Sequence, residues 1–159
     1  RYDAVLDEFK DCLVSVAPNW EKQGVDWNTI LPTQADTHLL VNTVFHTEFV
    51  VNLGSSMVFD YVTQDKACAY IRYDVANCPV ANWSVQKIYN FIHFRSMPSS
   101  NAVHWIDSAA AMEEVIVKMV SNTEPVVVEQ AQVWFNKINQ QPAQMASVRI
   151  WNAFDELLN

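Results

Sequence analysis

The feature that most restricts the fold of this chain is its shortage of glycine. Only two glycines occur in 159 residues, whereas average usage near 7% would give about eleven. Glycine supplies the positive-φ turns that β-sandwiches and β-barrels use repeatedly. The shortage therefore favours helices joined by short loops. It also excludes the glycine-rich phosphate loops of P-loop and dinucleotide-binding proteins.

Length and hydropathy predict one globular domain over residues 1–159. A chain of this length buries about two thirds of its unfolded surface, so it needs neither a metal nor a disulfide to fold. Half of the residues are apolar, as in ordinary globular proteins. No run of about 18 apolar residues occurs, so we expect no membrane span.

The charge is acidic and dispersed. The net charge is −8, from 18 acidic and 10 basic residues, and the basic residues are spaced singly. Without a basic patch, direct binding to nucleic acid is not expected. The three cysteines, Cys12, Cys68 and Cys78, make an odd count, so at least one thiol stays free in a monomer. This favours an intracellular protein, although the compartment itself stays open.

Apolar residues recur at helical spacing along most of the chain. The first such stretch covers residues 2–16 and ends before Pro18, and residues 18–33 resemble a connector. Later apolar stripes run over residues 85–92, 102–120, 127–138 and 146–157. Short breaks between helices imply antiparallel neighbours. We therefore predict a mainly α fold, a single-domain bundle of about five or six helices.

The stretch THLLVNTVFHTEFVV, residues 37–51, also favours a helix. Its polar residues come in pairs four positions apart, which places them on one helical face. The pattern predicts a helix from about residue 34 to residue 53, ended by Gly54. On that helix Glu48 would project near the middle of the apolar face, where a carboxylate needs a partner or a proton. The alternative is that the helix is rotated and Glu48 is exposed.

Residues 57–75 are ambiguous. They are rich in Val, Tyr, Phe and Ile, and the letters TQDK in their middle suit a four-residue loop. This favours a β-hairpin, with a helix as the alternative.

The sequence lacks the common short motifs of catalytic and metal-binding sites. It contains no Cys-x-x-Cys, His-Glu-x-x-His or Gly-x-Ser-x-Gly pattern, and no metal or cofactor is expected. Cys78, in a proline-containing loop, is a candidate nucleophile if His93 or His104 lies near it, and Glu48 is a second catalytic candidate. His93, Arg95 and His104 also form a candidate anion site, although the sequence favours a loop with solvated polar side chains over such a site.

Aromatic residues are more informative. The chain has six Trp, five Tyr and eight Phe, and Phe91, Phe94 and Trp151 fall off the core stripes of their helices. Aromatic side chains of this kind are enriched at binding interfaces. We therefore expect a non-catalytic protein-binding module or assembly subunit, an adaptor, inhibitor or structural component that binds another protein or itself. A small enzyme, a hydrolase or transferase, is the alternative, and a binder of an apolar small ligand is the third hypothesis.

Overall fold

The fold is mixed α/β and mainly helical, with just over half of its residues in helices. The computed structural model describes residues 2–26, 28–77, 82–121, 123–139 and 142–158. The chain forms two compact units, residues 1–46 and residues 47–159. The single domain over residues 1–159 stays a prediction.

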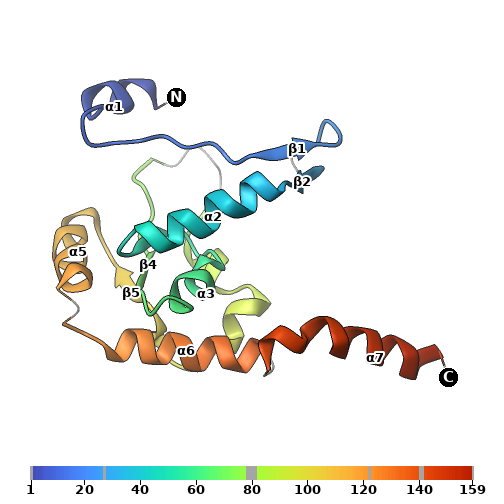
Figure 1. The fold of residues 1–159 in the computed structure, drawn as a ribbon. Helices are drawn as coiled ribbons and strands as arrows, with labels where there is room; N and C mark the ends of the chain where they lie inside the picture. The colour runs from blue at the N-terminus through green and yellow to red at the C-terminus, as the bar shows by residue number, and fades with distance from the viewer. Residues whose placement is uncertain (1, 27, 78–81, 122, 140–141, 159) are drawn as a thin grey trace. The chain divides into compact units, whose positions relative to one another are not determined.

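The described residues of the first unit form two helices and a β-hairpin. Its elements are α1 (Asp3–Glu8), β1 (Trp20–Lys22), β2 (Ile30–Pro32) and α2 (Gln34–His46) (Figure 1). Strands β1 and β2 pair antiparallel, with Glu21 opposite Leu31. The hairpin thus lies where the sequence predicted a connector.

Helix α1 is shorter than the predicted helix over residues 2–16. After Glu8 the chain continues in turns, and the N–H groups of Cys12 and Leu13 both donate to the carbonyl of Phe9. Val14 and Val16 follow before Pro18, and β-branched residues lower helix propensity. No residue of α1 is buried, so this stripe does not build a core.

The second unit contains the remaining elements. They are β3 (Val50–Asn52), α3 (Met57–Val62), β4 (Cys68–Ile71), α4 (Gln86–Tyr89), η1 (Ile92–Ser96), η2 (Ser100–Ala102), β5 (His104–Ile106), η3 (Ala109–Ala111), α5 (Met112–Val120), α6 (Val126–Ile138), η4 (Ala143–Met145) and α7 (Ala146–Leu158).

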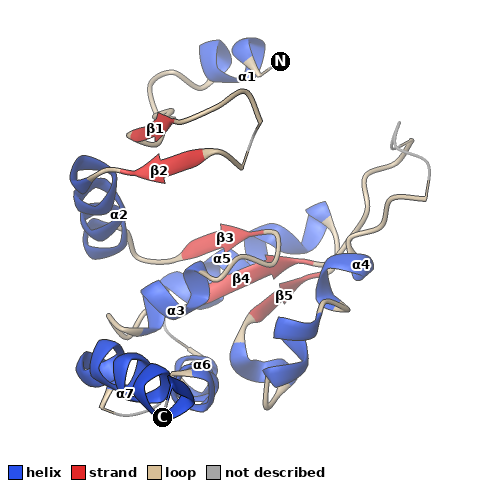
Figure 2. Ribbon diagram, turned by 90° about the vertical axis from the view of Figure 1, so that its right-hand side faces the viewer, coloured by secondary structure: helices blue, strands red, loops and turns tan. Residues whose placement is uncertain are grey.

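A parallel three-stranded sheet organises this unit. Strand β4 lies in the centre, between β3 and β5 (Figure 2). Val51 pairs with Ala69, and Tyr70 pairs with Trp105. The prediction of a mainly helical chain is confirmed, but the bundle is wrong, because the helices pack on the two faces of a parallel sheet.

Each face of the sheet has its own core. Successive side chains of a strand point to opposite faces, so Cys68 and Tyr70 face one side and Ala69 faces the other. The first side packs against α3 and α6 through residues such as Val58 and Trp134. On the second side, Ala69 and Ile106 pack with Val115 and Met119 of α5.

The predicted helix over residues 34–53 is correct only in its first part. Helix α2 ends at His46, and Val50–Asn52 form strand β3. Glu48 is exposed in the link between them, as the alternative had it, but the reason is that the helix ends before Glu48 and not that the helix is rotated. A parallel strand that is covered on both faces has a continuous apolar sequence, and periodicity alone does not separate it from a buried helix.

The predicted hairpin over residues 57–75 is also wrong. Its first half is helix α3, which buries Tyr61 and Val62. A turn with Asp65 at a φ of 55° then leads into β4. The hairpin and the helix were each predicted for the whole stretch. The stretch instead forms the helix and the second strand of a β–α–β unit.

Two more predicted helices are interrupted. The segment after Ser84 forms the short helix α4 and then η1. The stripe over residues 102–120 contains strand β5 before α5 begins at Met112. A three-residue strand can fit a helical stripe by chance, because three residues are too few to distinguish the strand period of 2.0 from the helix period of 3.6.

The last two stripes do form helices. In α6, Val127, Ala131 and Trp134 are buried as the periodicity predicts. Helix α7 also forms, yet it has no buried residue. Among the described residues, no helix is long and apolar enough to cross a membrane.

Candidate functional site

A continuous aromatic cluster lies on the α3 and α6 face of the sheet. Its members are Phe59, Tyr70, Tyr89, Phe94, Trp105 and Trp134. Tyr70 is the centre, with ring centroids 5.7 Å from Tyr89, 5.9 Å from Phe94 and 5.8 Å from Trp105. Phe94 then leads to Trp134 at 6.2 Å. The rings come from strands, short helices and α6, so only the folded topology assembles them.

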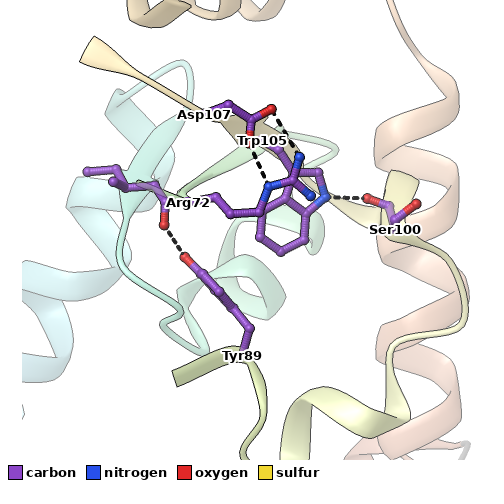
Figure 3. Close-up of polar contacts among 6 residues, drawn as sticks. Arg72, Tyr89, Ser100, Trp105 and Asp107 are labelled. Carbon is purple, nitrogen blue, oxygen red and sulfur yellow. Dashed lines mark hydrogen bonds and ion pairs between the residues drawn. The ribbon is translucent and has the colours of Figure 1, made fainter. Parts of the chain in front are cut away.

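An arginine covers one end of this aromatic cluster (Figure 3). The Arg72 guanidinium lies 4.7 Å from the Trp105 ring centroid, a distance at which cation–π attraction operates. Its Nε and Nη2 atoms donate to the two carboxylate oxygens of Asp107 at 2.6 and 3.0 Å. Arg72 follows β4 and Asp107 follows β5, so the pair joins the carboxyl ends of neighbouring strands.

Two further hydrogen bonds fix the rings beside this pair. The Trp105 indole Nε1 donates to the carbonyl of Ser100 at 2.7 Å. The Tyr89 hydroxyl donates to the carbonyl of Ile71 (Figure 3). Ring orientation here is therefore set by the backbone of two separate segments.

The electrostatics around Arg72, Asp107 and Tyr89 favour a structural role for these residues over acid–base chemistry. The Arg72 guanidinium holds the pKa of the Asp107 carboxyl below its usual range. Burial raises the pKa of Tyr89 to about 12, so its hydroxyl stays protonated at neutral pH. Arg72 and Asp107 neutralise each other, which leaves little net charge for an ionic ligand.

His104 lies on the opposite, α5 side of the sheet in a charged setting. Its side chain is buried, and its Nδ1 atom is 3.4 Å from Oε2 of Glu124. Lys118 Nζ contacts both Glu124 and Glu114, at 3.3 and 3.2 Å. Burial lowers the pKa of His104, and the opposing attraction of Glu124 is the smaller effect. The imidazole is therefore neutral at pH 7.

We expect the buried neutral His104 to make the protein less stable in mild acid. Between the lowered folded pKa and the unfolded value near 6.5, the unfolded chain binds more protons. This contribution to stability is present above pH 6.5 and is lost as the pH falls through the folded pKa. Urea unfolding at pH values from 7.5 to 5 should show a falling free energy of unfolding, and His104→Gln should make that decline shallower.

The exposed His38 provides the matched control for this experiment. His38→Gln should keep the pH dependence of the parent chain. If His104→Gln and the parent chain declined equally with pH, another group would cause the decline.

The structure separates the histidines of the predicted anion site. His93 is exposed and lines a pocket with Trp134 of α6. His104 lines a different pocket, with Val115 of α5. Arg95 is exposed on η1. The three side chains therefore do not form one site, because β5 directs His104 to the other face of the sheet.

The predicted nucleophile, Cys78, lies outside the described residues. Cys68 is buried, and burial raises the pKa of its thiol to about 12, so it is not a thiolate at neutral pH. Glu48 is exposed in the link before β3. A small enzyme that uses Cys78 with a histidine, or Glu48, stays a prediction.

The three predicted interface aromatics differ in exposure. Phe94 is buried in the aromatic cluster, where it contacts Tyr70 and Trp134. It is therefore not available as a surface anchor. Phe91 and Trp151 are exposed, and their role as anchors stays a prediction. Sequence reasoning missed Tyr70 and Trp105, because paired residues of different strands leave no local spacing signal.

Within the described ranges, no three His, Cys, Asp or Glu side chains are grouped as a metal site. No family model, curated protein or solved structure matches the chain.

Proposed function

We propose that this chain is a protein-docking module and that the apolar face of α7 is its docking surface. The observation that carries the proposal is that none of the 13 residues of α7 is buried, although the helix is strongly amphipathic. Trp151 is 68% exposed and Leu157 is 82% exposed. Large exposed apolar patches mark interaction sites on soluble proteins.

The apolar residues of α7 form one continuous face. At about 100° per residue, the large ones other than Val148 fall within an arc of roughly 120°. They are Ile150, Trp151, Phe154, Leu157 and Leu158. Such an arc is the width that a helix normally presents to a core.

An uncovered helix of this length needs a partner surface. Isolated helices shorter than about 12–15 residues are marginal in water, and α7 has 13. Among its described contacts, Arg149 Nη1 donates to the carbonyl of Pro142 at 2.7 Å, which leaves the apolar face uncovered. Tertiary cover of the apolar face is therefore the main stabilisation that α7 still lacks.

Charge favours a basic partner over a second copy of this chain. The net charge is −8, so two copies repel each other. Asp155 and Glu156 lie on the polar side of α7 and outnumber its one basic residue, Arg149. We therefore propose a partner that presents an apolar helix or groove rimmed by lysine or arginine, because complementary charge favours encounter and register.

Two dye-labelled helical peptides of about 15 residues test this proposal. Both carry the same Leu and Trp face; one is rimmed by lysines and the other by glutamates. In fluorescence anisotropy, the lysine peptide should bind more tightly, and 0.5 M NaCl should weaken it. A double change of Trp151 and Phe154 to Asp should weaken binding at least about 100-fold, since covering each aromatic is worth roughly 1.5–3 kcal/mol.

Val133→Asp is the matched control, because Val133 is a half-exposed apolar residue of α6. It should leave binding unchanged. Equal binding by the α7 variant and the parent chain would contradict the α7 surface. Equal binding of the two peptides would contradict only the proposal that the partner is basic, and not the α7 surface. Sedimentation of the free protein as a dimer that the α7 variant dissociates would identify a second copy as the occupant.

A further inference from the structure

A pocket of about 360 Å³ is lined by residues of β5, α5, the connector after α5 and the start of α6. Its charged lining residues are Lys118 and Glu124, and His104 lines it beside them. The apolar part of the lining consists mainly of valines, which are Val103, Val115, Val126 and Val127. Ligand sites are typically clefts of about 300–1,000 Å³ that combine apolar walls with a few converging polar groups. The pocket therefore has the size and the mixed lining of a small-molecule site.

The two charged side chains of the pocket are accessible and have opposite signs. Lys118 is 39% exposed and Glu124 is 41% exposed, and the Nζ atom of Lys118 lies 3.3 Å from Oε1 of Glu124. A positive and a negative group side by side do not select a ligand of one charge. They match a ligand that carries both charges on neighbouring atoms, with its carboxylate toward Lys118 and its ammonium group toward Glu124.

Both charged groups keep hydrogen-bonding capacity for such a ligand. An ammonium group has three donors, and Lys118 Nζ contacts Glu114 Oε1 at 3.2 Å and Glu124 Oε1 among the described residues. A carboxylate has about four lone-pair sites, and that of Glu124 contacts Lys118 and His104 Nδ1 within the same described part of the chain. Lys118 can therefore donate to a guest carboxylate, and Glu124 can accept from a guest ammonium group.

The surroundings of Glu124 hold its carboxylate in place. Its Oε2 atom lies 3.4 Å from Nδ1 of His104, whose side chain is buried on β5. The first turn of α6 follows, and Val126 and Val127 line the pocket. The N–H groups at the start of a helix attract a carboxylate. The ligand carboxylate is thus favoured on the side of Lys118 and α6, and the ammonium group at Glu124.

We propose that this pocket binds a zwitterionic α-amino acid with a small aliphatic side chain. Its two charged groups pair with Lys118 and Glu124, and its side chain lies against the valines, among which Val126 is 44% exposed. The proposal is independent of docking through α7. It gives the buried His104 a function, which is to hold the carboxylate that recognises the ligand.

Three probes with one carbon skeleton test the ligand class. They are L-leucine, isopentylamine, which lacks the carboxylate, and isocaproate, which lacks the ammonium group. Titrations are followed in ¹H–¹⁵N NMR spectra through the backbone amides of Val115, Lys118 and Val127. We expect leucine to shift these resonances and to bind at least about tenfold more tightly than either singly charged probe, because each charge adds a charge-assisted hydrogen bond.

A charge-removing substitution with a matched control tests the position of the site. Glu124→Gln keeps the shape of the side chain and should weaken leucine binding about tenfold or more, without weakening isocaproate binding. Glu129 is exposed on α6 and lies outside the lining, so Glu129→Gln makes the same change in net charge and should bind leucine like the parent chain. Absence of leucine-induced shifts at the three amides would overturn the site. Equal affinity for the three probes would overturn the ligand class, and unchanged leucine binding by Glu124→Gln would overturn the placement.

Discussion

Replacing Trp134 with alanine should lower the free energy of unfolding by about 3–5 kcal/mol, the cost of emptying a large buried aromatic site. Trp134 is 1% exposed, contacts Phe59 and Phe94, and donates to Ser96 Oγ. The substitution removes the ring contacts and leaves a cavity between the sheet and α6. Because small domains are stable by only about 5–15 kcal/mol, this change approaches the limit of folding.

The same substitution at Trp151 is the control. Trp151 is exposed on α7, so Trp151→Ala should change stability by no more than about 0.5 kcal/mol in the free protein. Urea unfolding followed by far-ultraviolet circular dichroism measures both variants without relying on tryptophan fluorescence. Similar losses at the two positions would mean that α6 does not pack as described.

Replacing Gly54 with alanine should cost about 2–4 kcal/mol, the sum of a left-handed backbone penalty and overpacking. Gly54 has a φ of +64°. A Cβ atom added there would lie 2.7 Å from Cγ2 of Ile88 and 3.0 Å from Cζ of Phe94. Both neighbours pack in the core or against it, so they have little room to move.

Gly24 provides the comparison within the same chain. An added Cβ there would approach Thr29 Oγ1 at 2.9 Å, which is the end of a mobile side chain, and no positive φ is involved. Gly24→Ala should therefore cost less than Gly54→Ala in the same urea experiment. The opposite order would show that the turn after β3 tolerates a side chain.

The sequence predicts long amphipathic helices well and short parallel strands poorly. The stripe of Val127, Ala131 and Trp134 spans a full α6 helix and is buried as expected. Strand β3 has three residues, too few for a period of two to differ from a helical one. Its partners are distant in sequence, with Val51 paired to Ala69, so no local pattern reveals the pairing.

The candidate sites depend on tertiary structure in the same way. The exposure of Trp151 did not follow from its place beside the predicted stripe, because Ile150, Phe154 and Leu157 on that stripe are exposed as well. Burial of Phe94 was not predictable either, since it depends on Tyr70 and Trp134 from other elements. Glu48 was misplaced for a similar reason: a strand begins where the apolar run suggested a continuing helix. The pocket beside His104 combines β5 with α5 and α6 and follows only from the tertiary fold.

Amide hydrogen exchange with and without the lysine-rimmed peptide tests the central claim, that α7 is a docking surface, most directly. In the free protein, amides of residues 146–158 should exchange faster than those of α6, because a helix without tertiary cover opens readily. On binding, these amides should slow by at least about tenfold, whereas those of β4 should change little. Protection that appears elsewhere while residues 146–158 continue to exchange rapidly would contradict the account.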